Sequence, residues 1–190
     1  MMIHPKYFSI LILLVLTTFT STFCQTTTTA VKVETKFEEH RKSRKVFWDN
    51  PPDSAGLVND YENLYTDIEE AILDSLITNF EKTTTVQIVV ITFDTTLISS
   101  DSLDALTLRL GNHWGVGQKN KNNGVVIGIS RGYRKMRIQN GYGIEKILSD
   151  AETKIIIETV FIPHFRNGEY YEGTSNGLKI LMATLIEKLN

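Results

Sequence analysis

Residues Thr85–Phe93 read TVQIVVITF. The stretch is β-branched and apolar on both alternating faces, which is typical of a strand that is covered on both sides. A second apolar run, Val125–Ser130, is followed by a tight connection at Arg131–Arg134 and by an alternating stretch, Lys135–Gln139. The sequence therefore predicts a sheet with two buried strands and a β-hairpin whose outer strand is half exposed.

Helical patterns flank these strands. Thr66 and Glu69 form a capping box that opens a helix ending near Phe80. The apolar residues expected on its buried stripe are Ile68, Ile72, Leu73, Leu76 and Phe80.

Three further helices are predicted. One spans residues 101–114, one starts at an N-cap on Asp150 and is broken or kinked near Pro163, and one spans residues 171–189. Helices thus alternate with strands along the chain. This order predicts an α/β fold, a three-layer α/β/α sandwich with a mixed central sheet that includes the hairpin.

The composition fits one ordinary globular domain, residues 56–190, because 42% of the 190 residues are hydrophobic and 22% are charged. The formal net charge of −2 and the lack of a basic run argue against nucleic acid as a partner. We interpret residues 25–55 as a Thr-rich and charged linker, in which the cluster Val46-Phe47-Trp48 packs on the domain edge as a strap.

The amino terminus has the pattern of a secretory signal peptide over residues 1–24. Lys6 precedes the apolar run Phe8–Leu16, and Thr22 and Cys24 suit cleavage before Gln25. An uncleaved segment that tethers the protein to a membrane is the alternative, and acylation of Cys24 ranks last because bulky Phe23 precedes it. We expect export to the periplasm or the medium as a monomer, with peripheral or tethered membrane association open.

Several chemistries are excluded by inspection. Cys24 is the only cysteine, so the mature domain has no thiol nucleophile and no zinc–thiolate site. The stretch from Gly141 lacks the third glycine of a dinucleotide fingerprint, and the loop from Gly115 to Gly124 lacks the ending of a P-loop. A cofactor that is a nucleotide is therefore not expected.

The candidate functional groups that remain are side-chain oxygens at points where the chain reverses direction, which could bind a cation. Asp60 follows the short apolar stretch Leu57-Val58, Asp94 follows the central strand, and the amide-rich loop Asn120–Gly124 precedes the next strand. Ligands of open α/β sheets collect outside the carboxyl ends of strands, and carboxylate and amide oxygens suit calcium. The alternative interpretation of Asp60 and Asp94 is that they form turns and cap helices.

Five ordered motifs resemble the TPM domain family, a family named after a thylakoid lumen protein, a photosystem repair protein and a worm receptor modulator. The resemblance covers about residues 56–190. The motifs are Val58-Asn59-Asp60-Tyr61, Gln87-Ile88-Val89-Val90, Trp114–Lys119 with Asn123-Gly124-Val125, Gly141–Glu145 and Ile162–Tyr170.

The resemblance implies an exported α/β/α domain, often tethered to a membrane, that binds calcium or another divalent cation such as magnesium or manganese near the sheet edge. It places Asp60, Asn123, Gly124 and Asp150 at shared polar positions, whereas Asp94 is our inference from the strand end. The implied functions are an assembly, repair or interaction module for an envelope protein partner, or an acid phosphatase. A phosphatase also needs a cationic clamp, and Lys119 and Lys121 are the only candidates that the sequence pattern offers.

Overall fold

The structure, a computed structural model, describes residues 32–189. The predicted signal peptide and residues 25–31 of the predicted linker lie outside the described residues. Residues 32–49 of that predicted linker are helical. The chain divides into two compact units, Met1–Ser43 and Arg44–Asn190, and the description below concerns the second. No helix within residues 32–189 combines the length and apolarity that a membrane span requires.

The central sheet has four strands in the order β1-β2-β3-β4. The first two pairs of neighbours are parallel, and the last pair is antiparallel, which confirms the predicted mixed sheet with its hairpin. The strands are β1 (Val58–Asp60), β2 (Gln87–Thr92), β3 (Gly124–Ser130) and β4 (Lys135–Asn140).

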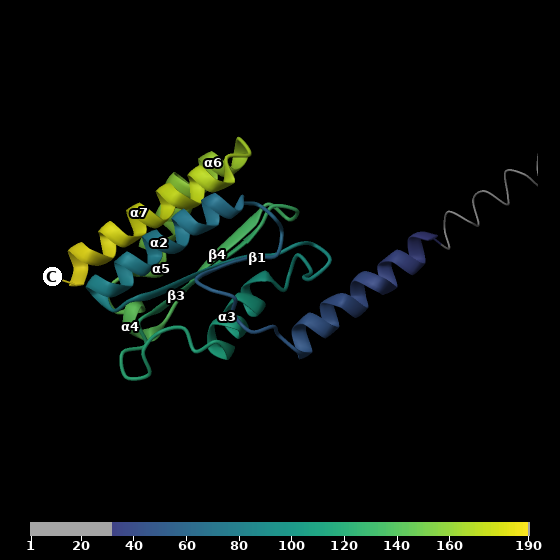
Figure 1. The fold of residues 1–190 in the computed structure, drawn as a ribbon, viewed down its shortest axis with the longest axis horizontal. Helices are drawn as coiled ribbons and strands as arrows, with labels where there is room; N and C mark the ends of the chain where they lie inside the picture. Colours follow the sequence, from purple (N-terminus) through teal and green to yellow (C-terminus); the bar gives the residue numbers. More distant parts are fainter. Residues whose placement is uncertain (1–31, 190) are drawn as a thin grey trace, which may run out of the picture. The chain divides into compact units, whose positions relative to one another are not determined.

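Helices cover both faces of this sheet, as Figure 1 shows, which confirms the three-layer α/β/α fold. Helix α3 packs on one face, and α2, α5 and α7 form the layer on the other. The helices are α2 (Asp67–Thr84), α3 (Leu103–His113), α4 (Tyr142–Glu145), α5 (Asp150–Ile156), the π-helical segment η1 (Ile157–Phe161), α6 (Ile162–Arg166) and α7 (Tyr170–Leu189).

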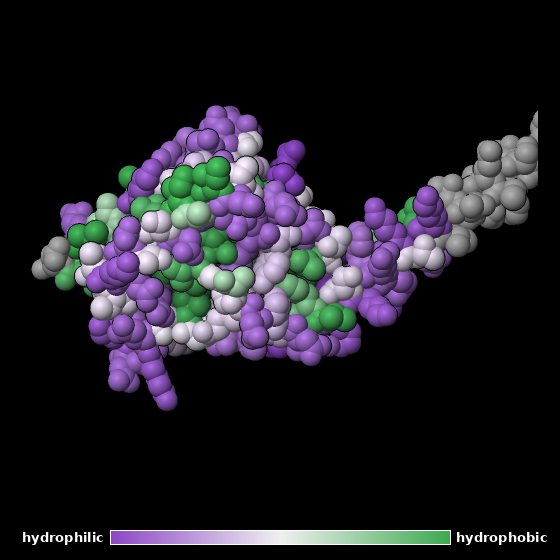
Figure 2. Space-filling model, in the orientation of Figure 1, coloured by the Kyte–Doolittle hydropathy of each residue, from purple (hydrophilic) through white to green (hydrophobic). Residues whose placement is uncertain are grey.

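Helix α2 begins as predicted, because Thr66 is its N-cap and completes a capping box with Glu69. The predicted buried stripe is partly wrong. Ile68 is 74% exposed and Ile72 is 49% exposed, whereas Ile77, which the prediction omitted, is fully buried. The buried face is thus rotated from the predicted one, and apolar surface remains over the helical layer (Figure 2).

The segment after β4 differs from the prediction in two ways. Ser149, not Asp150, is the N-cap of α5, and Glu152 completes its capping box. Pro163 does not end the helical path. The chain passes from α5 through the π-helical segment η1 into α6, where Pro163 lies in the first turn.

Two packing details fix the outer elements. Phe47 is buried and its ring meets that of Tyr61 edge-on with a centroid distance of 5.4 Å, in agreement with the predicted strap. Gly177 of α7 faces the ring of Phe161, and a Cβ at Gly177 would lie 2.2 Å from that ring. Glycine therefore allows α7 to approach η1 closely.

Candidate functional site

The carboxyl ends of the three parallel strands meet at one edge of the sheet. Asp60 of β1 pairs with Thr92 of β2, and Thr92 pairs with Ile129 of β3. Asp94 follows β2 at the same edge. The fold therefore brings Asp60 and Asp94 to one edge, here called the carboxyl edge, as the sequence analysis predicted from the strand ends.

Asn123 and Gly124 lie at the opposite edge, here called the amino edge. Gly124 pairs with Gln87, the first residue of β2. Five residues of strand separate this level from Thr92, which corresponds to about 16 Å. The five predicted ligands therefore do not converge on one site.

Asp150 also belongs with the amino edge. It is the exposed first residue of α5. The beginning of α5 is linked to Asn140, whose side-chain amide donates a hydrogen bond to Thr153, and Asn140 pairs with Val125 near the start of β3.

At the amino edge the amide groups serve the loop itself. The Asn123 side chain accepts a hydrogen bond from the Gln118 backbone N–H and donates one to the Thr85 carbonyl. Gln87 accepts from the Gly117 N–H. Gly124 packs so tightly that a Cβ would lie 2.2 Å from the Val116 carbonyl oxygen. These residues fix the loop before β3, and the side-chain amides of Asn123 and Gln87 are engaged in hydrogen bonds within the protein.

At the carboxyl edge, Asp60 and Asp94 also form hydrogen bonds within the protein. Asp60 accepts from the Tyr65 backbone N–H and from the Thr92 hydroxyl, and Asp94 accepts from the backbone N–H of Thr96. These contacts correspond to the turn-forming interpretation that the sequence left open. They occupy oxygen atoms that a cation would need.

Glu62 is a third carboxylate at this edge, and sequence reasoning missed it. Its two oxygens accept the backbone N–H groups of Arg131 and Gly132 at 2.7 and 2.8 Å, and the residue is only 6% exposed. Burial is the largest cause that raises the pKa of Glu62, and the charge of Asp94 raises it further, while the two N–H bonds and the Arg131 charge oppose the shift. Glu62 thus joins the β3–β4 turn to the carboxylates after β1 and β2.

Within residues 32–189, no group of three or more His, Cys, Asp or Glu side chains is arranged to hold a metal ion. The predicted five-ligand site does not fit, because the ligands divide between two edges of the sheet.

A cleft of about 1110 Å³ opens next to the carboxyl edge, at the side of β4. Four basic side chains line it, and its acidic lining consists of Asp104 and Glu158. The basic residues are Arg131, Arg134, Lys135 and Arg166. The expectation that Lys119 and Lys121 are the only candidate cations is therefore wrong, since the fold gathers other cations from the hairpin turn and α6.

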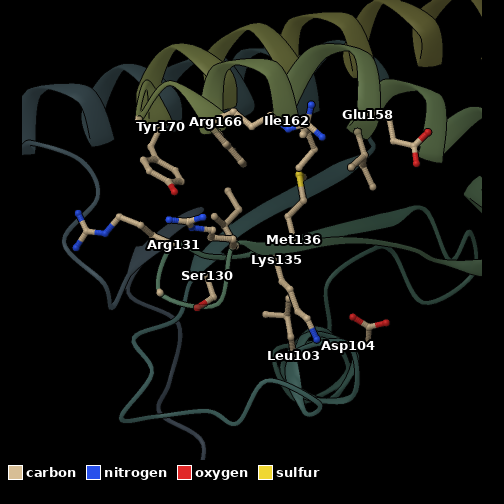
Figure 3. A pocket seen from close by; sticks show the side chains of 16 residues that line it. Leu103, Asp104, Ser130, Arg131, Lys135, Met136, Glu158, Ile162, Arg166 and Tyr170 are labelled. Carbon is tan, nitrogen blue, oxygen red and sulfur yellow. The ribbon is translucent and has the colours of Figure 1, made fainter.

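Figure 3 shows how the cleft is built. One wall of the cleft is the helical layer, which carries Tyr170, Arg166 and Ile162. The opposite wall is α3, which carries Leu103 and Asp104. The hairpin lies between the two layers. The basic groups therefore come from separate elements that only the tertiary fold brings together.

The basic side chains of this cleft form no close ion pair within residues 32–189. The ion pairs formed within residues 32–189 include none of the four basic residues that line it. Lys135 instead donates to the Ser100 carbonyl oxygen at 2.8 Å. Burial and the charge of Glu62 raise the pKa of the Tyr170 hydroxyl, and the charges of Arg131 and Arg134 oppose that rise. The hydroxyl thus lies within electrostatic reach of all three groups.

The structure is an α/β/α domain with a cleft, lined mainly by basic residues among its charged groups, beside the ends of its parallel strands. The profile of the TPM domain family matches residues 58–184. This chain belongs to the TPM domain family.

Solved structures agree with this assignment. The N-terminal domain of a protein from P. gingivalis is 32% identical, with a TM-score of 0.64 over 72% of this chain and 85% of that one. The BA42 protein from the psychrophilic bacterium Bizionia argentinensis is 20% identical, with a TM-score of 0.59 over 67% of this chain and 86% of that one.

The N-terminal domain of the cg2496 protein from Corynebacterium glutamicum is 14% identical, with a TM-score of 0.53 over 71% of this chain and 83% of that one. At 20% and 14% identity, the last two structures show likeness of fold alone. No curated protein matches the chain.

Proposed function

We propose that this TPM domain is an interaction module that binds an anionic group of a partner protein in the cleft beside the carboxyl edge. One observation carries the proposal: the basic residues outnumber the acidic ones in the cleft lining, and none of them is ion-paired within residues 32–189. Guanidinium groups bind carboxylates and phosphates through paired hydrogen bonds, so the cleft suits either group.

The test uses two small probes, acetylated tetraglutamate and inorganic phosphate, and the double variant Arg134→Gln/Arg166→Gln. We expect tetraglutamate to bind the wild-type protein and the double variant to bind it about tenfold more weakly, because each guanidinium contributes up to about 0.7 kcal/mol at an exposed site. Isothermal titration calorimetry measures both affinities.

Lys119→Gln is the matched control, because it removes one positive charge from an exposed position at the amino edge. It should leave the affinity unchanged. Equal weakening by Lys119→Gln would mean that net charge alone attracts the probe. Absence of binding by both probes would refute the proposal.

A divalent cation at the carboxyl edge is a second candidate, and one observation favours it. The charge of Asp94 helps to raise the pKa of Glu62, so two carboxylates lie close enough to repel each other. A bound calcium, or magnesium or manganese, would relieve that repulsion. Asp60 lies at the same edge, and ion binding would require these carboxylates to give up part of their present hydrogen bonds.

Calcium titration of the protein tests this second candidate. Because a ligand that binds only the folded state raises its stability, bound calcium should raise the melting temperature. Asp94→Asn should weaken calcium binding at least tenfold, whereas Asp150→Asn, at the amino edge, should not. An absence of heat with calcium, magnesium and manganese would reject it.

Acid phosphatase activity is the alternative in another functional class. It is favoured by the proximity of guanidinium groups, which can hold a phosphoryl group, to the carboxylates of the carboxyl edge. Release of phosphate from p-nitrophenyl phosphate decides the question. Activity that disappears in Arg134→Gln/Arg166→Gln would support the enzyme, and turnover no greater than the blank would support the interaction module.

Export belongs to the same proposal. The signal-like pattern of residues 1–24 supports a role in the periplasm or outside the cell, with an envelope protein as the partner. Fractionation of cells that express the tagged chain tests it. Recovery of the intact chain in the cytosolic fraction would contradict it.

A further inference from the structure

The cleft runs beside a free edge of the sheet. β4 is the last strand in the order β1-β2-β3-β4, and among the described residues only β3 pairs with it. Lys135 and Met136, its first two residues, belong to the cleft lining. In Figure 3 Lys135 and Met136 lie between the helical layer and α3, so the cleft opens beside the beginning of this strand.

A free strand edge has its own binding chemistry. The backbone N–H and C=O groups on that side of β4 can pair with an extended chain, which is how peptides add to exposed sheet edges. The Nε of Arg137 on the same strand is buried and has no hydrogen-bond partner within residues 32–189. An acceptor carried by an added chain would satisfy such a donor.

The side chains around the edge define what the added chain should contain. Arg131 and Arg134 belong to the hairpin turn and Arg166 to α6, and all three line the cleft. Apolar groups also line the cleft, namely Met136, Ile157 and Ile162. Since the lining holds both basic and apolar groups, a chain that carries both acidic and apolar side chains matches this surface.

We propose that an extended acidic segment of a partner protein adds to β4 as a fifth strand. Its backbone pairs with the edge of β4, its apolar side chains meet the apolar groups of the cleft, and its carboxylates reach Arg131, Arg134 and Arg166. This inference rests on the proposed interaction function and names the form of the partner. A phosphorylated small molecule and an anionic membrane are the competing occupants.

Selection from random octapeptides displayed on phage measures the sequence preference of the cleft directly. We expect the wild-type protein to enrich peptides that contain both acidic residues, Asp or Glu, and apolar residues, Val, Ile or Leu. The dissociation constants of the best synthetic peptides should rise at least tenfold for Arg134→Gln/Arg166→Gln and remain unchanged for Lys119→Gln.

The strand geometry is tested with two analogues of the best peptide, each N-methylated on one alternate set of backbone amides. One set faces β4 and the other faces away. One analogue should therefore lose binding at least tenfold while the other retains it, and amide chemical-shift changes should extend along Lys135–Asn140.

Each contrary outcome identifies what fails. If both analogues bind as well as the parent peptide, charge attracts the chain without strand addition, and this inference falls while the interaction function stands. Enrichment of peptides without acidic residues also overturns it. If neither tetraglutamate nor any displayed peptide binds, both proposals fail. Binding to phosphatidylglycerol vesicles, without any peptide binding, would overturn the strand-addition proposal and would indicate an anionic membrane as the partner of the cleft.

Discussion

The two edges of the sheet are both rich in polar residues, yet they use them differently. At the amino edge, Asn123 and Gln87 form hydrogen bonds that close the loop before β3. At the carboxyl edge, Glu62 anchors the hairpin turn, while Arg134 and Arg166 line a cleft without ion-pair partners among the described residues. Polar residues at a strand end therefore indicate a ligand site only where groups remain without partners.

The largest loss of stability is expected from a substitution that disrupts packing at the amino edge. Gly124→Ala should destabilise the protein by about 3 kcal/mol or prevent folding, because the new Cβ would lie 2.2 Å from the Val116 carbonyl oxygen. Gly115→Ala is the control. Gly115 has φ of +65° but open space around it, so a loss of about 1 kcal/mol is expected. Urea unfolding measures both, and equal losses would contradict the packing argument.

The next largest loss of stability is expected from a substitution that removes hydrogen bonds at the carboxyl edge. Glu62→Ala leaves the backbone N–H groups of Arg131 and Gly132 without their acceptor, so we expect a loss of about 2 to 3 kcal/mol. Glu187→Ala, an exposed position on α7, should change stability by less than about 0.5 kcal/mol. If the midpoint of urea unfolding is the same for Glu62→Ala and the wild-type protein, Glu62 does not anchor the turn.

A third change tests the structural role of the amide loop. Asn123→Ala removes the hydrogen bonds to Gln118 and Thr85 and should destabilise the protein by about 2 kcal/mol. Asn120→Ala, in the same loop but exposed, should have little effect. Differential scanning calorimetry compares the two variants. A loss of anion binding in Asn123→Ala at full stability would instead place the ligand site at the amino edge.

A smaller expected effect is the pH dependence of stability, which differs between a carboxylate at the carboxyl edge and one near the amino edge. Burial raises the pKa of Glu62 above 4.5, so the wild-type protein should lose stability relative to Glu62→Gln as the pH rises from about 4.5. The Lys188 ammonium, followed by Ser149, lowers the pKa of Glu152 from 4.5 to about 2. Relative to Glu152→Gln, the wild-type protein should therefore lose stability as the pH falls from about 4.5 towards 2.

The two pH dependences have opposite signs, and unfolding in urea at several pH values measures both. The same sign for the two variants would contradict the assigned environments. The pKa of Glu62 would then be lowered, and its hydrogen bonds to the turn would outweigh its burial.

The framework of the fold could be predicted from local sequence signals. The capping box of Thr66 and Glu69, the apolar run of β2 and the alternation of β4 are each formed by residues close together in sequence, and each was found where expected. The errors arose where tertiary packing selects between local options. Ser149 caps α5 in place of Asp150, and Ile77 is buried whereas Ile68 is exposed.

The candidate site could be predicted only in part. Asp60 and Asp94 were assigned to one edge because they end parallel strands, which is a rule of topology. Arg131 and Arg134 resembled ordinary residues of a solvated turn, and Arg166 is distant from them in sequence. No periodic pattern connects such residues. Asn123 and Gly124 were grouped with the wrong edge because the sequence does not show which end of β3 faces Asp60.

Mapping of the amides that respond to acetylated tetraglutamate tests the central claim most directly. In ¹H–¹⁵N correlation spectra of the protein, we predict the largest shifts at Arg131, Arg134 and Arg166 and along Lys135–Asn140. Residues 118–124 should not respond. The largest shifts at residues 118–124, or no shifts at any concentration up to the solubility limit of the probe, would contradict an anion-binding cleft at the carboxyl edge.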